Sequence, residues 1–276
     1  MPYSYRSLID KLRGAGIENA SEEAAMLLCH VCGIGRATCL ADRDRVWDDP
    51  TLERLVELRC TRYPLQYILG EWSFYGCDFV VNEHCLIPRP DTELLVEYAI
   101  ESIPKNATVA DLCTGSGCIA IALLRARPDV RVVALELFED TLSLACENAR
   151  RNGVADRFVP IRADLLSDGV EKLTPHAPFD AILSNPPYIR REDLTSLEPE
   201  LSHEPRAALD GGEDGMVFYR AILSDYWRLL KNGGLVLLEI GHDQAADVTG
   251  IAPAGVTVTV TKDLGGNDRV VAMTKP

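Results

Sequence analysis

The stretch Asn185-Pro186-Pro187-Tyr188 combines residue types that could hold a planar nitrogen for reaction, and it follows an apolar run that ends at Ser184. The lone pair of such a nitrogen is delocalised, so the nitrogen reacts readily only when acceptors orient its N–H bonds. The side-chain oxygen of Asn185 and the backbone carbonyl of Pro186 can be those acceptors. Pro187 stiffens the turn, and the Tyr188 ring can pack on the planar group. Taken alone, the four residues could equally form an ordinary turn.

A second candidate site lies in residues 108–124, TVADLCTGSGCIAIALL, whose pattern predicts a strand, a glycine loop and a helix. Gly115 and Gly117 permit a tight turn and a close approach to a ligand. By itself this pattern would also suit a nicotinamide dinucleotide. Asp111 at the first strand end could face an ammonium group, and Glu136 at the next could take two ribose hydroxyls. The two acids favour S-adenosyl-L-methionine, which carries an amino-acid group and a ribose but no phosphate; alternatively, they only cap helices.

The two candidate sites support one chemistry when they are taken together. Asp164 and Leu165, after the third expected strand, offer a polar partner and an apolar surface for adenine. The fourth strand, expected beside the first in a doubly wound sheet, ends at Asn185 and so would bring the planar-nitrogen site next to the glycine loop. This arrangement predicts methyl transfer to a nitrogen. No strong base is needed, because the methylated nitrogen becomes acidic.

Two patterns of hydrophobic residues divide the chain into parts that must position these sites. From Tyr3 to about Leu69, apolar residues recur at helical spacing, which predicts four or five short helices. Two β-rich runs around Asn82-Glu83-His84 predict a hairpin. From about Asp91, strands alternate with helices, which predicts an α/β fold with a doubly wound, mostly parallel sheet of seven strands. The expected parts are an N-terminal helical domain (1–72), a β-hairpin linker (73–90) and a Rossmann-like methyltransferase domain (91–276).

The expected elements of the last part can be stated by residue. The helices are Thr92–Ser102, Gly117–Arg127, Glu139–Asn152 and Gly215–Leu230. The strands are Thr108–Leu112, Arg131–Glu136, Arg157–Ile161, Phe179–Ser184, Gly234–Ile240, Val256–Thr261 and Arg269–Thr274.

The composition of the chain limits which classes of partner and which cellular compartment we expect. The 276 residues carry a formal net charge of −14, which disfavours a nucleic-acid substrate and is compatible with a basic protein partner. Nine cysteines without a disulfide framework indicate reduced thiols. Cys29 and Cys32 have a spacing seen in zinc sites, but no second pair follows, so no metal is expected. No run approaches the roughly 20 apolar residues of a membrane span. The N-terminus lacks a signal-peptide core, so we expect a cytoplasmic protein without membrane contact.

Two segments are more distinctive than the Asn-Pro-Pro-Tyr stretch, which DNA adenine methyltransferases share. They are LIPRPDTELLVE (86–97) and HEPRAALDGGEDGMVFYRAI (203–222). In these segments, and in PLQYILGEWSFYG (64–76), GGLVLLEIG (233–241) and DLGGNDRVV (263–271), the chain resembles the bacterial protein-glutamine N5-methyltransferases of the HemK/PrmC family. Members of that family methylate the glutamine of the Gly-Gly-Gln loop in peptide chain release factors.

The resemblance implies methyl transfer from S-adenosyl-L-methionine to the glutamine side-chain nitrogen, leaving S-adenosyl-L-homocysteine. It also implies a release factor as partner, docked by the helical domain and hairpin, and we expect a monomer. The expected catalytic residues are Asn185, Pro186 and Tyr188, and those expected at the substrate are Asn185, Pro186, Pro187, Tyr188, Arg89 and Pro90. The residues expected at the donor are Asp111, Cys113, Thr114, Gly115, Ser116, Gly117, Glu136, Asp164, Leu165 and Asn185.

The chain departs from the family pattern at three positions. Cys113 stands where the family usually has Gly, Glu136 where it usually has Asp, and Leu165 where some members have an aromatic residue. We therefore expect only backbone contact at Cys113 and a longer reach to the ribose from Glu136. Glu198, Glu200 and Glu204 are expected to form a solvated loop face. The rival hypotheses are an amino-group methyltransferase acting on DNA or RNA, and a non-catalytic donor-binding adaptor for release factors.

Overall fold

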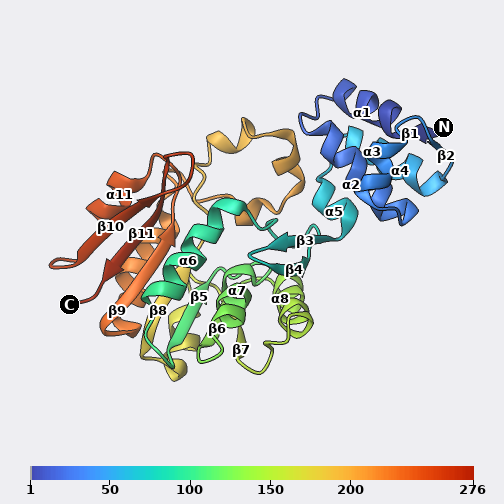
Figure 1. Ribbon diagram of the computed structural model, residues 1–276. Coiled ribbons are helices and arrows are strands. Elements are labelled where there is room, and N and C mark those ends of the chain that lie inside the picture. Colours follow the sequence, from blue (N-terminus) through green and yellow to red (C-terminus); the bar gives the residue numbers. More distant parts are fainter. Residues whose placement is uncertain (1) are drawn as a thin grey trace. The chain divides into compact units, whose positions relative to one another are not determined.

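The computed structural model describes residues 2–276, and these fall into two compact units (Figure 1). One unit contains the chain up to Glu71 together with Glu198–His203. The other contains Trp72–Leu197 and Glu204–Pro276. Among the described residues, no helix is both long and apolar enough to cross a membrane.

The first unit is a bundle of five helices around a leucine-rich core. Its helices are α1 (Tyr5–Gly14), α2 (Ala20–Cys32), α3 (Arg36–Ala41), α4 (Pro50–Cys60) and α5 (Leu65–Leu69), with β1 (Tyr3–Ser4) paired to β2 (Val46–Trp47). Side-chain caps begin two helices: Ser4 accepts from Ser7 N–H before α1, and Asp49 accepts from two N–H groups before α4. Leu8, Leu28 and Leu52 are fully buried in the shared core.

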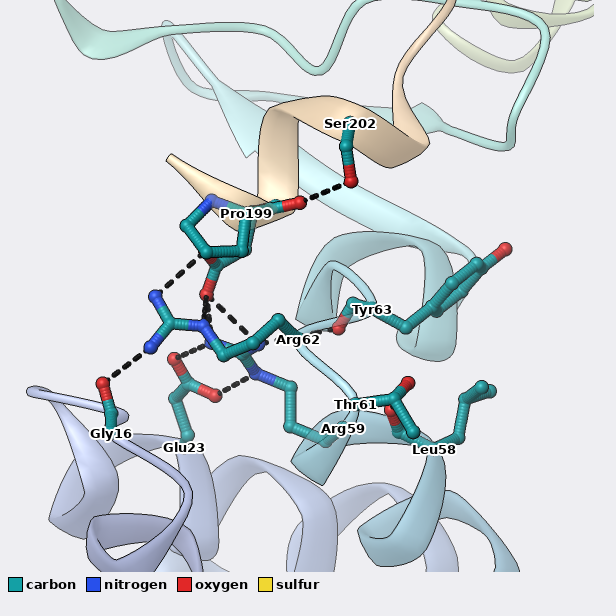
Figure 2. Close-up of polar contacts among 10 residues, drawn as sticks. Gly16, Glu23, Leu58, Arg59, Thr61, Arg62, Tyr63, Pro199 and Ser202 are labelled. Carbon is teal, nitrogen blue, oxygen red and sulfur yellow. Dashed lines mark hydrogen bonds and ion pairs between the residues drawn. The ribbon is translucent and has the colours of Figure 1, made fainter. Parts of the chain in front are cut away.

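The turn Pro199–His203 lies in the segment Glu198–His203, which belongs to this helical unit although the chain on either side of it belongs to the other. Figure 2 shows Arg59 and Arg62 converging on it. Arg59 is 4% exposed and pairs with Glu23 at 2.6 Å and with Glu200 at 3.1 Å. Arg62 pairs with Glu200 at 2.7 Å. The expectation of a solvated Glu200 is therefore wrong. Its carboxylate pairs with the buried Arg59 guanidinium, which would be costly without acidic partners.

The second unit is built on a seven-stranded sheet in the order β10-β11-β9-β8-β5-β6-β7. Its strands are β5 (Thr108–Leu112), β6 (Arg131–Glu136), β7 (Phe158–Arg162), β8 (Phe179–Ser184), β9 (Leu230–Glu239), β10 (Thr257–Lys262) and β11 (Asp268–Thr274). The pairs from β9 to β7 are parallel, whereas β11 is antiparallel to both of its neighbours, β9 and β10. This order confirms the predicted fold class and places β8 directly beside β5. β5, β6 and β8 have the predicted bounds.

Helices cover this sheet, and its central strands β5, β6 and β8 are buried along almost their whole length. They are α6 (Glu93–Ser102), α7 (Cys118–Ala126), α8 (Glu139–Arg151), α9 (Gly169–Leu173), α10 (Val217–Ala221) and α11 (Ala245–Gly250). α6, α7 and α8 pack side by side (Figure 1). α10 continues through a π turn (Ile222–Tyr226) and a 3-10 turn (Trp227–Leu229), and it buries Tyr219 and Tyr226 in the core.

The hairpin turns at a different place from the predicted one. Strands β3 (Glu71–Phe74) and β4 (Cys77–Val80) meet at Tyr75 and Gly76, which have φ angles of 48° and 69°. A two-residue turn with both φ angles positive suits the twist of a hairpin. Asn82, where the turn was expected, instead begins a separate turn in which it accepts hydrogen bonds from His84 and Cys85 N–H.

Candidate active site

A cavity of about 390 Å³ lies in the second unit where β5, β6 and β8 end. Sequence-predicted residues in its wall are Arg89, Cys113, Thr114, Gly115, Ser116, Glu136, Asp164, Leu165, Asn185 and Pro187. Other sequence-predicted residues, namely Pro90, Asp111, Gly117, Pro186 and Tyr188, are not in its wall. The fold thus gathers residues from distant segments at one edge of the sheet, as expected for the carboxyl ends of parallel strands.

The glycine loop needs its unusual backbone at three positions. Cys113, Gly115 and Gly117 have φ angles of 60°, 57° and 81°. A Cβ on Gly117 would lie 2.9 Å from Ile121 Cδ1 and 3.3 Å from Ala145 Cβ, so Gly117 lets α7 and α8 approach the loop. A Cβ on Gly115 would meet no atom within 4 Å. Gly115 therefore serves the turn conformation, while Cys113 adopts this left-handed conformation at a cost of about 1 kcal/mol.

Asp111 lies beneath the loop as a buried acid with unused hydrogen-bonding capacity. Its Oδ2 accepts from the Thr114 hydroxyl at 2.5 Å, whereas its Oδ1 has no hydrogen-bond partner among the described residues. The neighbouring Ser116 hydroxyl likewise lacks a partner within the described part of the chain. Burial raises the pKa of Asp111 to about 7, while the Thr114 hydroxyl and the Ala120 N–H favour its charged form. These orphaned polar atoms fit a ligand that brings hydrogen-bond donors, such as the ammonium group of S-adenosyl-L-methionine.

Glu136 ends β6, binds the backbone on both sides of the cavity edge and lines the cavity. Its Oε2 accepts from Gly115 N–H at 3.0 Å, and its Oε1 accepts from Leu137 and Phe138 N–H at 2.9 and 3.2 Å. Burial raises the pKa of Glu136, although the three backbone donors oppose that shift. Three of the roughly four lone-pair sites of the carboxylate are thus used, and the remaining one, on Oε2, can take a ribose hydroxyl.

An apolar rim surrounds the polar groups of the cavity. Leu137, Phe138 and Leu166 all line it, although they are 43%, 47% and 49% exposed. Large apolar residues exposed around one cavity indicate a surface that a ligand covers. Leu165 was the one apolar adenine contact predicted from the sequence, beside the polar Asp164; the apolar pair Leu137-Phe138 directly after Glu136 was the signal for two of the others.

The end of β8 is fixed on several sides. The Ser184 hydroxyl donates to the Leu112 carbonyl at 2.6 Å, which ties the strand end to β5. The Asn185 side-chain nitrogen donates to Thr92 Oγ1 at 3.2 Å. Pro186 and Pro187 are buried. Burial raises the pKa of Tyr188 to about 12, so its hydroxyl stays neutral.

The second distinctive segment, residues 203–222, braces this strand end from outside. Ile189 N–H donates to the Leu209 carbonyl at 2.9 Å, and Gly211 N–H donates to the Ile189 carbonyl at 2.8 Å. A Cβ on Gly211 would lie 2.7 Å from Tyr188 Cα, and one on Gly215 would lie 2.5 Å from the Tyr188 carbonyl oxygen. These glycines therefore permit a close approach between two backbone segments.

Arg89 is anchored by an acid that was expected in solvent. Glu204 is 6% exposed, pairs with Arg89, and accepts from Ile87 N–H at 3.0 Å. Burial raises the pKa of Glu204, and Arg89 opposes that shift. The expectation of a solvated Glu204 is therefore wrong: the acid links the segments 86–97 and 203–222 at the cavity wall.

Comparison with known proteins agrees with this geometry. Residues 5–70 match the PrmC N-terminal domain family, and residues 90–231 match the Methyltransferase small domain family. The chain is 40% identical over 279 aligned positions to the release factor glutamine methyltransferase of Geobacter sulfurreducens, covering 98% of this chain and 96% of that one. It is 37% identical to the protein of the same name from Thermodesulfovibrio yellowstonii, with 92% of each chain covered.

A solved methyltransferase from Pyrococcus furiosus shares the fold, with a TM-score of 0.55 at 18% identity over 74% of this chain and 91% of that one. The glycine loop, Glu136 and the strand-end residue Asn185 meet at one cavity, and the sequence relationship extends along nearly the whole chain. The chain belongs to the family of release factor glutamine methyltransferases.

Proposed function

We propose that this protein transfers a methyl group from S-adenosyl-L-methionine to the side-chain amide nitrogen of the glutamine in the Gly-Gly-Gln motif of peptide chain release factors. One observation carries the proposal: Asn185 and the acid Glu136 share the wall of a single cavity. Asn185, which would bind the substrate amide, and Glu136, which would bind the donor ribose, therefore face the same cavity.

The donor, when bound, supplies an electrophilic methyl group on a positively charged sulfur. Asp111 Oδ1 and the loop Thr114–Gly117 hold its amino-acid end, and Glu136 holds its ribose. Leu165, with Leu137 and Phe138, covers the adenine, and Asp164 bonds its edge. Support comes from the unpartnered Asp111 Oδ1, the cavity position of Glu136 and the exposed apolar rim.

The substrate glutamine is held by the end of β8. Asn185 Oδ1 and the Pro186 carbonyl accept its two N–H bonds, which orients the nitrogen toward the methyl group and weakens amide conjugation. A new N–C bond forms as the C–S bond breaks, and the extra proton on nitrogen then leaves to water. Tyr188 packs near the amide plane, while Arg89 and Pro90 border the entrance for the glutamine. The buried prolines and the brace from Gly211 support a strand end that keeps its shape.

The release factor binds through a surface larger than the cavity. We assign docking to the helical unit, which matches the PrmC N-terminal domain family over residues 5–70, and to the hairpin that follows it. The net charge of −14 suits a basic partner and disfavours a nucleic-acid substrate. The protein acts as a monomer in the cytoplasm.

Transfer of labelled methyl groups tests this proposal. The protein is incubated with labelled S-adenosyl-L-methionine and, in separate reactions, with a release factor, its Gly-Gly-Gln→Gly-Gly-Ala variant, and DNA. We expect label on the release factor alone. Label on DNA would favour an amino-group methyltransferase, and donor binding without label on any substrate would favour a non-catalytic adaptor.

A further inference from the structure

A buried carboxyl group lies directly behind Asn185, on a strand that the proposed reaction has not used. Glu239 ends β9, one residue beyond Leu238, which pairs with Ser184 of β8. Glu239 is therefore the neighbour of Asn185 across the two parallel strands. It is 2% exposed, and its Oε2 has no hydrogen-bond partner among the residues described. Burying a carboxyl group without full hydrogen bonding costs free energy, so its presence here indicates a function.

The surroundings of Glu239 fix which way the Asn185 amide faces. Thr92 and Asn185 lie beside the Glu239 carboxyl group and favour its charged form, and the Asn185 nitrogen donates to Thr92 Oγ1 at 3.2 Å. Thr92 is itself 1% exposed. An amide has one donor end and one acceptor end. With its nitrogen directed to Thr92, on the side of Glu239, Asn185 has its oxygen left for the cavity that it lines.

We propose that Glu239 is a positioning residue for methyl transfer: as a carboxylate it holds the Asn185 amide with the oxygen toward the substrate and makes that oxygen a stronger acceptor. A hydrogen bond from the amide nitrogen to an anion polarises the amide, so negative charge gathers on Oδ1. Positive charge develops on the substrate nitrogen as the methyl group arrives. The Glu239 carboxylate therefore stabilises the transition state more than the ground state. This role rests on the proposed function.

Other charged or titratable groups face Glu239 from several elements. Arg269 on β11 and Asp91 in the turn before α6 act on it with opposite signs. Arg269 pairs with Asp91 at 3.3 Å and with Asp263 at 2.9 Å, so its charge is shared. The neutral hydroxyls of Tyr188 and Tyr219 and the thiol of Cys118 also lie in its field. Burial raises the pKa of Glu239 to about 7, while Thr92 and Asn185 favour the carboxylate.

The variant Glu239→Gln removes the charge at constant shape and tests this role. We expect kcat on a release factor to fall roughly 10- to 100-fold, with the donor dissociation constant unchanged. In the native protein at saturating donor, kcat should rise with pH through about 7 as Glu239 loses its proton. The Gln variant should lack that rise. Asp180→Asn is the matched control, because Asp180 accepts from Thr108 N–H and pairs with Lys231 at the other end of the strands.

A double-mutant cycle with Asn185→Ala separates positioning from an independent effect. If Glu239 acts through Asn185, Glu239→Gln should cause no further loss of kcat in the Asn185→Ala background. Thr92→Val should resemble Glu239→Gln, and Thr92→Ser should restore most of the rate. Donor binding and thermal unfolding confirm that each variant is folded.

Additive losses, or a full kcat with a native pH profile in Glu239→Gln, would overturn the role of Glu239 while leaving the proposed function intact. A native protein that transfers no methyl group to the release factor would overturn both.

Discussion

At the scale of single residues, Asp111 and Glu136 do different work in the donor site. Glu136 is occupied by three backbone donors, which fix its carboxylate before any ligand arrives. Asp111 keeps one oxygen unpartnered at zero exposure. The first is a preorganised acceptor, whereas the second is an unsatisfied group that a cationic ligand would complete.

Donor affinity should therefore depend on pH through Asp111. Burial raises its pKa to about 7, and a bound ammonium group favours the carboxylate, so affinity should increase as the pH rises through that value. The folded protein without donor holds this proton more tightly than the unfolded chain, so it loses stability as pH rises from about 4 toward 7. Asp111→Asn should weaken donor binding about 10-fold and remove its pH dependence. Calorimetric titration at several pH values measures both effects, and an unchanged pH dependence in Asp111→Asn would contradict this assignment.

At the scale of elements, the sequence predicted the sheet well because its strands are buried and β-branched runs mark them. It also predicted which strand ends meet, since β8 beside β5 follows from doubly wound topology. It could not predict the contacts that depend on three-dimensional closure. Glu200 and Glu204 looked solvated among charged neighbours, yet both bind arginines that lie far away in the chain. The role of Glu239 was also not predicted, because an acid at the end of a strand is usually interpreted as a helix cap or a surface residue.

The packing of residues 203–222 against the Asn-Pro-Pro-Tyr strand end should not tolerate an added methyl group at Gly211. A Cβ at Gly211 would lie 2.7 and 2.8 Å from Tyr188 backbone atoms, and neither segment can move without losing its hydrogen bonds. We expect Gly211→Ala to lower the free energy of unfolding by about 1–3 kcal/mol and to reduce kcat more than donor affinity. Gly250→Ala, where a Cβ meets no atom within 4 Å, is the control. Native activity in Gly211→Ala would show that the close contact has no functional role.

The turn Pro199–His203 should depend on its central acid. Removing the charge in Glu200→Gln leaves Arg59 with the Glu23 carboxylate and the Tyr63 carbonyl, so we expect a loss of about 1–3 kcal/mol in the stability of the helical unit. Burial opposes ionisation of Glu200, but hydrogen bonds from Arg62 and Arg59 lower its pKa overall. Its contribution is therefore present at neutral pH and lost as the pH falls through that lowered value.

Thermal unfolding and limited proteolysis of residues 198–203 measure the effect of Glu200→Gln. The exposed Glu198→Gln serves as control. Equal stability of the two variants would mean that the Glu200 ion pairs contribute nothing measurable.

At the scale of the whole molecule, net charge governs how the enzyme meets its partner. A net charge of −14 should attract a basic protein over a distance that salt shortens. We expect the KM for the release factor to rise with ionic strength while the donor dissociation constant changes little. Initial rates at low and high salt test this expectation. A KM that does not respond to salt would mean that docking relies on apolar or hydrogen-bonded contacts.

The central claim is that Asn185 holds a glutamine amide for methyl transfer, and a single-turnover experiment tests it most directly. Native protein and Asn185→Ala are loaded with labelled S-adenosyl-L-methionine and mixed with a release factor, and the methylated residue is identified by mass spectrometry. We predict one methyl group on the glutamine of the Gly-Gly-Gln motif. We also predict that Asn185→Ala transfers it at least ~100-fold more slowly with donor affinity retained. Methylation at another residue, or a native rate in Asn185→Ala, would contradict the account.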